Sequence, residues 1–332
     1  MKRYGDLMGR ILDYENLLVA FHHAAKGKAD RKDVIQFRKN LSENLLTLRE
    51  KLDTDSMIFG KYSFFTVHDP KTRNICAAEF KERVAHHALM TVCGPILDQS
   101  QIFHSYACRK GKGQHKALLK AKEWAIGHDF YLKMDISKFF DSIDHAILKQ
   151  MLGTRIKDKK VLNILFDIIA SYHIAHGKGL PLGNLTSQYF ANFYLTRFDH
   201  WIKQEKKAGF YLRYMDDMLI TGNKPMLLKL RDDSRRYLKK EFKLQLKHGG
   251  QINRTDKGIG FLGSVIYPGA LKLGSSSKKR ICGKIKQYEK RYRSGKIDAL
   301  DLQERTNALW AGLYHIKSHG WRKNLAEKCM DI

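Results

Sequence analysis

The first fifty residues carry apolar side chains at helical spacing. Between residues 7 and 25 one face repeats Leu7, Ile11, Tyr14, Leu17, Leu18 and Phe21. A second run with the same period begins at Val34 and ends at Leu52. This period predicts two amphipathic helices that each bury one face. The basic connector between them, residues 26–32, fits either a solvated loop or a contact with nucleic acid.

Runs that are rich in β-branched and aromatic residues predict strands in the middle of the chain. Residues 58–67 and 72–75 flank an Asp69-Pro70-Lys71 turn signal, and residues 130–136 form a buried strand that ends at a carboxylate. Residues 211–220 fit a hairpin with Asp216 and Asp217 at or beside its turn. Shorter strand-like runs are residues 244–246 and 258–266.

Helical patterns separate and follow these strands. They cover residues 80–97, 116–126, 159–172, 187–206 and 224–242, and a short helix ends near residue 152, with Ser142 or Asp141 as its expected cap. Two basic helices follow from about residue 275, the second over residues 300–315. The chain has no internal repeat and no low-complexity linker, which predicts one interlocked unit.

The charge of the chain points to a polyanionic partner. Lys and Arg number 61 against 34 acidic residues, which gives a formal net charge of +27, and the basic residues are spread over the whole sequence. Such an excess destabilises the compact state by self-repulsion unless a polyanion is the usual partner. Nucleic acid is the first candidate, and a merely soluble basic protein is the alternative.

The cysteines and the apolar runs indicate a cytoplasmic protein that does not enter a membrane. The five cysteines form no CxxC pair, which argues against a zinc module and against a disulfide framework. No apolar region follows the N-terminus as in a signal peptide, and no run of about 18 apolar residues is present.

Three carboxylates are the candidate catalytic groups. Asp216 and Asp217 interrupt two apolar runs, and acids there are costly unless Lys, Arg or a divalent metal lies against them, although a solvated turn is the plain alternative. Asp135 ends another strand, so neighbouring strands of one sheet would bring all three acids together. Three close carboxylates do not all stay ionised without a cation. Two Mg²⁺ ions about 3.5–4 Å apart would resolve this and are a known arrangement for phosphoryl transfer.

An ordered set of motifs resembles the reverse transcriptases of bacteria and phages. The hairpin tetrapeptide Tyr-Met-Asp-Asp at residues 214–217 looks like the palm motif of that family. The other motifs are Asp-Pro-Lys-Thr-Arg-Asn-Ile (69–75), Ser-Tyr-Ala-Cys-Arg-Lys-Gly-Lys-Gly (105–113), Met-Asp-Ile-Ser-Lys-Phe-Phe-Asp (134–141), Leu-Pro-Leu-Gly-Asn-Leu-Thr-Ser-Gln (180–188) and Gly-Phe-Leu-Gly (260–263). The resemblance implies an RNA-directed DNA polymerase with an α+β, right-hand polymerase fold.

The same resemblance implies a division into polymerase subdomains. It assigns residues 1–56 to an N-terminal helical extension and residues 57–126 to the fingers. Residues 127–268 would be a palm with an antiparallel sheet and inserted fingers helices, and residues 269–332 a helical thumb.

Metal ligands and a proton donor follow from the resemblance. Asp135, Asp216 and Asp217 would be catalytic and would hold two Mg²⁺ ions, with Mn²⁺ as a substitute. Ile136 would add its backbone carbonyl to the metal site. Lys247 is the nearest candidate for the general acid that protonates pyrophosphate.

Further residues would bind the nucleotide and the primer. Arg73 would hold the triphosphate of the dNTP with a bidentate guanidinium. Lys138 and Phe139 would offer backbone amides to it, with the Phe139 ring in the core, and Phe140 would exclude a ribose 2′-hydroxyl. The dNTP site would also include Leu182 and Gly183. The primer grip would be Phe261, Leu262 and Gly263.

One segment resembles a narrower group, the reverse transcriptases of diversity-generating retroelements. The Gly-Asn-x-Thr-Ser-Gln sequence at residues 183–188 is typical of that group. It implies cDNA synthesis from a template-repeat RNA, errors opposite template adenine, and a small basic accessory protein as partner. Leu182 stands where many relatives have a polar residue, and together with Arg73 it would govern fidelity, unless it serves only packing. The alternatives are a retron, group II-like or phage-defence reverse transcriptase, and an RNA-binding scaffold without catalysis.

Overall fold

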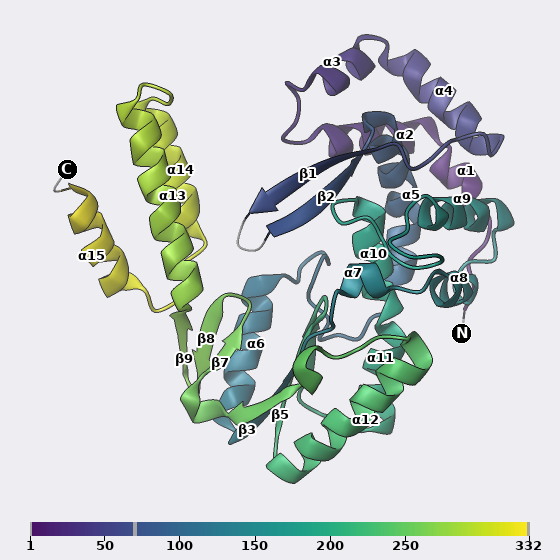
Figure 1. Cartoon of the computed structure of the whole chain (residues 1–332). Helices are drawn as coiled ribbons and strands as arrows, with labels where there is room; N and C mark the ends of the chain where they lie inside the picture. The colour runs from purple at the N-terminus through teal and green to yellow at the C-terminus, as the bar shows by residue number, and fades with distance from the viewer. Residues whose placement is uncertain (1, 69–71, 331–332) are drawn as a thin grey trace. The chain divides into compact units, whose positions relative to one another are not determined.

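The computed structural model describes residues 2–68 and 72–330, so the predicted Asp69-Pro70-Lys71 turn lies outside the described residues. The chain folds into two compact units that interleave along the sequence (Figure 1). Unit 1 comprises Met1–Cys108, Ile136–Lys207 and Asp233–Lys247. Unit 2 comprises Arg109–Asp135, Ala208–Asp232 and His248–Ile332.

Unit 1 is mainly helical and is built around one buried helix, α5 (Phe80–Asp98). Helix α5 packs against α2 and α10, and Gly94 lies so close to the Tyr189 ring that a Cβ atom there would meet it at 2.8 Å. The helices of this unit are α1 (Met8–Ile11), α2 (Tyr14–Ala25), α3 (Lys32–Lys39), α4 (Leu41–Asp53), α5, α7 (Phe139–Ser142), α8 (His145–Gly153), α9 (Lys159–Ala170), α10 (Leu185–Tyr194), α11 (Thr196–His200), the π-helix η1 (Trp201–Glu205) and the 3-10 turn η2, which begins at Lys247.

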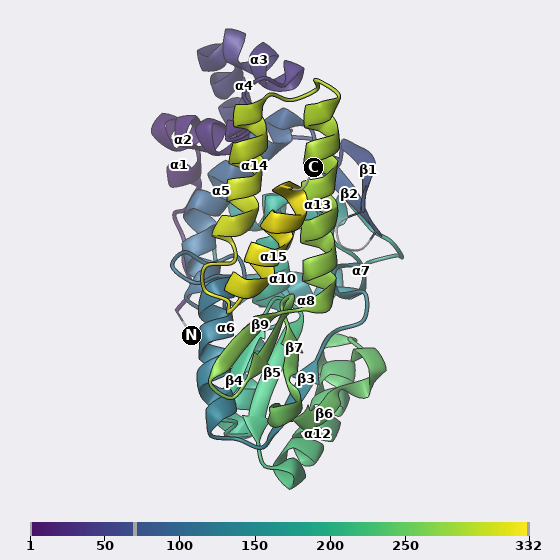
Figure 2. The same ribbon diagram turned by 90° about the vertical axis from the view of Figure 1, so that its left-hand side faces the viewer.

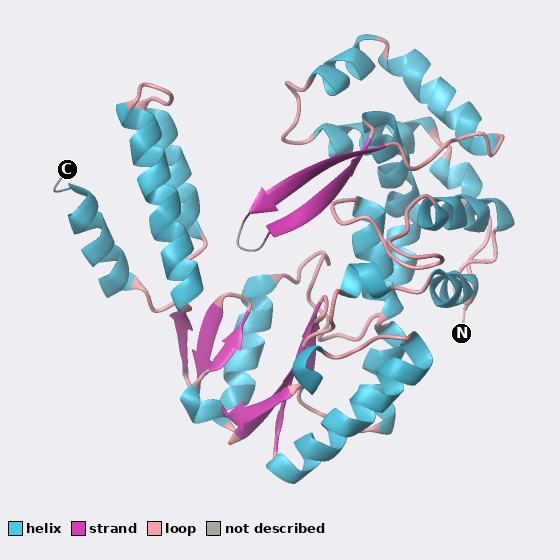
Figure 3. Cartoon of the chain, in the orientation of Figure 1, coloured by secondary structure: helices cyan, strands magenta, loops and turns pink. Residues whose placement is uncertain are grey.

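A hairpin of two strands also belongs to unit 1. Strands β1 (Tyr62–His68) and β2 (Thr72–Ala78) pair antiparallel, from Tyr62 opposite Ala78 to His68 opposite Thr72 (Figure 3). The predicted strands on both sides of the turn signal are therefore confirmed.

Unit 2 contains two antiparallel sheets on one helix. The first sheet has the order β4-β5-β3-β6, with β4 (Tyr211–Tyr214), β5 (Asp217–Gly222), β3 (Phe130–Met134) and β6 (Gln251–Arg254). The second has the order β7-β8-β9, with β7 (Ile259–Phe261), β8 (Ser264–Tyr267) and β9 (Ala270–Leu273). Helix α6 (Gln114–Ile126) contacts strands of both sheets through an apolar face that includes Leu118 and Trp124.

The C-terminal part of unit 2 is helical. Helix α13 (Ser275–Arg293) packs against α14 (Ala299–Ala311), and the two lie side by side in both views (Figures 1 and 2). Helix α15 (His319–Met330) follows, and the 3-10 turn η3 (Thr255–Lys257) precedes β7. Helix α12 (Lys224–Phe242) contains the boundary between the two units.

Several predicted boundaries were wrong. The helix expected over residues 34–52 breaks at Asn40, whose φ of −121° and ψ of 51° are not helical, and the one expected over 187–206 is divided into α10, α11 and η1. The cap of α8 is Asp144, not Ser142 or Asp141, since the Ile147 N–H donates to its carboxylate at 3.1 Å. The strand expected at 244–246 is a single bridge between Leu246 and Ile136.

None of the helices in the described ranges combines the length and the apolar character that a bilayer crossing requires.

Candidate active site

The hairpin that carries two of the carboxylates is closed by a two-residue turn. Tyr214 pairs with Asp217, so Met215 and Asp216 form the turn between β4 and β5. Met215 has a φ of 58°, the left-handed conformation that tight hairpins require at their first turn position. Such a conformation is costly for a residue other than glycine, and the surrounding strands hold Met215 in it. The turn therefore fixes Asp216 at the tip of the hairpin, as predicted.

The third carboxylate follows the strand beside this hairpin. Strand β3 pairs with β5, and its last residue, Met134, lies opposite Met218. Extending this register by one residue puts Asp135 level with Asp217, and opposite residues of an antiparallel pair face the same side of the sheet. All three carboxylates are partly exposed. The predicted adjacency of the two strands is thus confirmed.

Two basic side chains of unit 2 support this edge of the sheet. The Nζ atom of Lys133 lies 3.8 Å from Oδ1 of Asp217 and donates to the Gly260 carbonyl at 2.9 Å. Arg213 is fully buried, and its Nη1 atom donates to the Met215 carbonyl at 3.0 Å. The sequence left open whether a basic side chain or a divalent metal lies against these acids. The structure shows a basic side chain, Lys133, beside Asp217.

Sequence reasoning missed the roles of both basic residues, but it had one signal. Arg213 stands in the apolar interior of a strand, where a charged side chain is almost never fully buried unless it is paired. Lys133 offered no such signal, because a lysine on a strand is ordinarily exposed.

The arrangement can accept a metal, but it does not form a complete cage. Among the described residues no three His, Cys, Asp or Glu side chains come close enough together to hold a metal ion. Carboxylate oxygens are nevertheless the ligands that Mg²⁺ prefers, and it commonly uses only one or two protein carboxylates with substrate phosphates. The donor chemistry of Asp135, Asp216 and Asp217 therefore fits the ion.

The residues predicted to bind the nucleotide belong to unit 1, and three of them lie on two bonded segments. The Cys76 N–H of β2 donates to the Leu182 carbonyl at 2.8 Å, and the Ala78 N–H donates to Oδ1 of Asn184 at 3.3 Å. Gly183 has a φ of 118°, and a Cβ atom there would meet the Cys76 carbonyl at 2.9 Å. Leu182 and Gly183 are thus tied to the strand that carries Arg73, whose side chain is exposed.

The Phe139 and Phe140 rings have different environments. Phe139 is buried, as predicted, and Phe140 is half-exposed. The Leu180 N–H donates to the Phe140 carbonyl at 2.9 Å, which links Phe140 to the segment that carries Leu182. Lys138, just before them, has a φ of 46°, so this loop also holds a residue in a strained conformation.

The predicted primer grip is the turn between β7 and β8 in unit 2. Phe261 pairs with Ser264, so Leu262 and Gly263 form the turn, and both have positive φ angles. The Leu262 carbonyl accepts a 2.7 Å bond from the Gln114 side chain.

The predicted general acid, Lys247, lies in unit 1. It is exposed, and it directly follows Leu246, which is bridged to Ile136.

A family model described as "Reverse transcriptase (RNA-dependent DNA polymerase)" matches residues 68–253, more than half of the chain. The chain belongs to the reverse transcriptase family. The match spans Arg73, the three carboxylates and the segment around Leu182, and it confirms the predicted enzyme class, an RNA-directed DNA polymerase.

This reverse transcriptase has bacterial and intron-encoded relatives. It is 21% identical over 320 residues to Protein YkfC of Escherichia coli (strain K12), a match that covers 79% of this chain and 82% of YkfC. It is 26% identical over 143 residues to the Group II intron-encoded protein LtrA of Lactococcus lactis subsp. cremoris, which covers 41% of this chain and 24% of LtrA. The reverse transcriptase thus matches about a quarter of the length of LtrA.

A solved structure supports the fold class. The apo telomerase of Candida tropicalis aligns with a TM-score of 0.51 and 14% identity, over 76% of this chain and 57% of the telomerase chain. With the antiparallel sheets and helices described above, this likeness confirms the predicted α+β polymerase fold of the reverse transcriptase.

Proposed function

We propose that the chain copies RNA into DNA by two-metal nucleotidyl transfer at Asp135, Asp216 and Asp217. The observation that carries this proposal is the register of β3 and β5, which lines up Asp135 with Asp217 beside the hairpin turn. Bound Mg²⁺, or Mn²⁺ in its place, would activate the primer 3′-hydroxyl and stabilise the leaving pyrophosphate. The Ile136 carbonyl would complete the metal ligands.

Primer extension on an RNA template tests the proposal. In the presence of Mg²⁺ we expect the wild type to extend a DNA primer with dNTPs, and Asp216→Asn and Asp135→Asn to fall to background. Asp256→Asn is the matched control, because Asp256 is an exposed acid of the same unit that pairs with Arg254. Equal extension by wild type and Asp216→Asn would reject the enzymatic proposal. RNA binding without any extension, even by the wild type, would favour the scaffold alternative.

The dNTP would be bound by the residues of unit 1 named above. The exposed Arg73 guanidinium suits a triphosphate, because its planar fork pairs with two phosphate oxygens. The half-exposed Phe140 ring suits a gate against a ribose 2′-hydroxyl, and the loop at Lys138 and Phe139 supplies backbone amides. Phe261, Leu262 and Gly263 would contact the primer, and Lys247 would protonate the pyrophosphate.

We further propose that the enzyme serves a diversity-generating retroelement and copies a template-repeat RNA with errors opposite adenine. The Gly-Asn-x-Thr-Ser-Gln sequence at 183–188 supports this subtype, and a small basic protein would be its partner. Leu182 has an apolar side chain, which does not hydrogen-bond a correctly paired nucleotide, so discrimination built on such bonds is weakened. The likeness to LtrA favours the second candidate, a group II-like reverse transcriptase.

Sequencing of cDNA made by the Leu182→Gln variant tests whether Leu182 affects fidelity or serves only packing. We expect fewer misincorporations opposite template adenine, and unchanged errors opposite the other bases. Ile174→Gln, an equal change at an exposed position, serves as the control. A wild-type cDNA without excess errors at adenine would reject the diversity-generating subtype and leave the polymerase proposal intact.

A further inference from the structure

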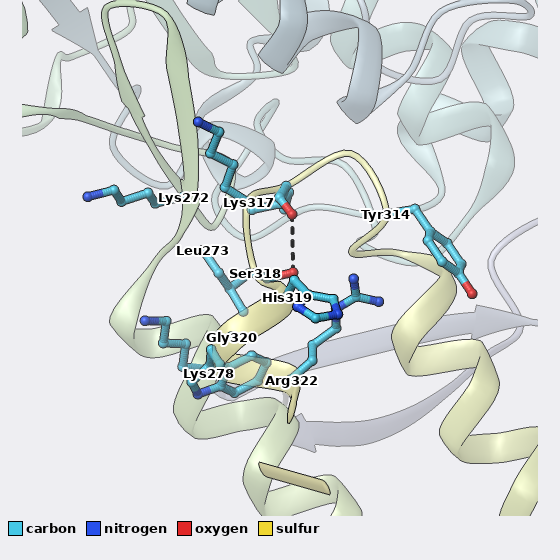
Figure 4. A pocket seen from close by; sticks show the side chains of 11 residues that line it. Lys272, Leu273, Lys278, Tyr314, Lys317, Ser318, His319, Gly320 and Arg322 are labelled. Carbon is cyan, nitrogen blue, oxygen red and sulfur yellow. Dashed lines mark hydrogen bonds between the residues drawn. The ribbon is translucent and has the colours of Figure 1, made fainter. Parts of the chain in front are cut away.

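A cavity of about 510 Å³ lies in unit 2, away from the carboxylates in sequence. It is lined by residues of β9, α13, the segment after α14 and the first turn of α15 (Figure 4). The cavity is large enough for a small ligand, since ligand pockets span roughly 300–1,000 Å³.

Two lysines lie on neighbouring segments at this cavity. Lys272 of β9 forms a parallel bridge with Lys317, and the Lys317 N–H donates to the Leu271 carbonyl at 3.0 Å. Like charges at directly opposite positions of a strand pair destabilise the pairing. Both side chains are exposed, and the Nζ atom of Lys272 lies 5.1 Å from the centre of the Tyr267 ring. A bound anion would convert this repulsion into attraction.

The rest of the lining is also basic. Lys278 and Arg322 add two further cations, and the lining residues, all of which are described, include no carboxylate. The Nε atom of Arg322 is buried without a hydrogen-bond partner among the described residues, whereas its guanidinium carbon lies 5.6 Å from the centre of the Tyr314 ring. The cavity therefore offers several donors to an anionic ligand.

Aromatic rings complete the cavity. Tyr314 is 72% exposed, and in Figure 4 it lies across from Lys272 and Lys317. Trp321 is half-buried, and Lys278 Nζ lies 6.0 Å from its ring centre. Cationic side chains beside exposed aromatic rings are the combination that binds single-stranded nucleic acid, with phosphates on the cations and bases stacked on the rings.

We propose that this cavity binds one or two nucleotides of a single-stranded nucleic acid. The phosphate contacts the Lys272–Lys317 pair and Lys278, and an unpaired base stacks on Tyr314 or Trp321. The ligand is a strand, RNA or DNA, because a continuous strand supplies both the phosphates and the unpaired base. This site goes beyond the polymerase proposal and needs neither metal nor dNTP.

Fluorescence anisotropy with the full chain and labelled ten-nucleotide RNA and DNA strands, without metal, tests the phosphate contacts. For Lys272→Ala/Lys317→Ala we expect weaker binding of the strands, and a plot of log affinity against log salt that is less steep by about 1.4, since each phosphate on a single strand contributes about 0.7. Lys279→Ala/Lys286→Ala removes the same charge from exposed positions of α13 outside the cavity and is the matched control. An equal loss of affinity and an equal change of salt slope in Lys279→Ala/Lys286→Ala would overturn the proposed site.

The aromatic contact has its own variants. Loss of one stacked base weakens binding about five- to a hundredfold, and we expect this range for Trp321→Leu and Tyr314→Ala. Trp321 also packs against Trp310, whereas Tyr314 is 72% exposed and contacts the Arg322 guanidinium, so its replacement should perturb the fold less. Trp321→Leu and Tyr314→Ala should bind a blunt RNA–DNA duplex with the same affinity as the wild type, because a duplex has no unpaired base to stack. An equal loss for the duplex, or adenosine monophosphate bound as tightly as the strand, would overturn the proposal.

Discussion

At the scale of single residues, the carboxylates are supported by cations that only the structure reveals. The three acids could be identified from sequence because each ends or interrupts an apolar run. Lys133 could not, because its bonds to Asp217 and to the Gly260 carbonyl depend on the register of β3 and on the position of β7. Lys133 thus links a catalytic candidate to the strand before the predicted primer grip.

Replacing Lys133 by Met should change how the protein responds to Mg²⁺. Without the ammonium group the carboxylates repel each other more strongly, so we expect the metal-free protein to lose about 1 kcal/mol of stability. The same change should enlarge the increase in melting temperature on addition of Mg²⁺, because the ion then relieves more repulsion. Thermal unfolding with and without Mg²⁺ measures both effects. Lys120→Met, which breaks the surface pair with Glu123, is the control, and an Mg²⁺ response equal to the wild type would contradict the role of Lys133.

His86 predicts a pH dependence of folding. It is buried in α5, stacks on Phe59 at 6.0 Å between ring centres, and burial lowers its pKa to about 3. Below the ordinary histidine pKa of about 6.5 the unfolded chain takes up a proton that the native protein does not, so stability falls as the pH falls from about 6.5 toward 3. The loss at pH 4.5 is about 2–3 kcal/mol.

Chemical unfolding at pH 7 and pH 4.5 measures this loss. In His86→Gln the difference in unfolding free energy between the two pH values should shrink by that amount, whatever the variant does to stability at pH 7. The exposed His22→Gln is the matched control. A pH response of His86→Gln identical to the wild type would rule out this histidine as the cause.

At the scale of elements, sequence periodicity identified most helices and the hairpin that carries Asp216, and it missed strands whose identity depends on a partner. The sequence of β6, Gln-Ile-Asn-Arg, is largely polar and exposed, and the segment is a strand because it adds to the edge of β3. Strand β9 lies within residues that were assigned to a helical thumb, and it forms by pairing with β8. An edge strand such as β6 or β9 needs few apolar residues of its own, so its sequence does not identify it as a strand. The buried strands β3 and β5 are recognisable as apolar runs.

The bond between β2 and the Leu182 segment depends on a glycine. In Gly183→Ala the new methyl group would meet Ile75 at 2.6 Å and the Cys76 carbonyl at 2.9 Å, in addition to the strain of a φ of 118°. We expect a loss of about 1–3 kcal/mol and a raised KM for dNTP, because the segment moves away from the strand of Arg73. Gly113 has a φ of 102° and no atom within 4 Å of an added Cβ, so Gly113→Ala measures the backbone strain without the contact. Equal KM values for the two variants would show that the contact with β2 is irrelevant to nucleotide binding.

At the scale of the whole molecule, the sequence predicts the family but does not determine the template or the fidelity. The reason for this difference is physical. The family is predicted from a set of motifs in a particular order, and that order is visible in the sequence from Arg73 to Gly263. The choice of template and the fidelity would depend on a few contacts with nucleic acid, such as the one proposed for Leu182, which the sequence pattern does not constrain. The net charge of +27 describes the class of partner but not its identity.

That charge predicts opposite effects of salt on folding and on binding. Added salt screens the self-repulsion of the free protein, so its melting temperature should rise between about 50 and 500 mM NaCl. Its affinity for RNA should fall steeply over the same range, because bound RNA releases counterions. Substoichiometric heparin at low salt should raise the melting temperature as NaCl does, since it neutralises the same surface. A neutral osmolyte at the osmolality of the added NaCl should not reproduce the effect of salt on RNA affinity, because it screens no charge. A melting temperature that falls as salt is added would show that local ion pairs, such as that of Lys243 with Asp144 at 2.6 Å, outweigh the net repulsion.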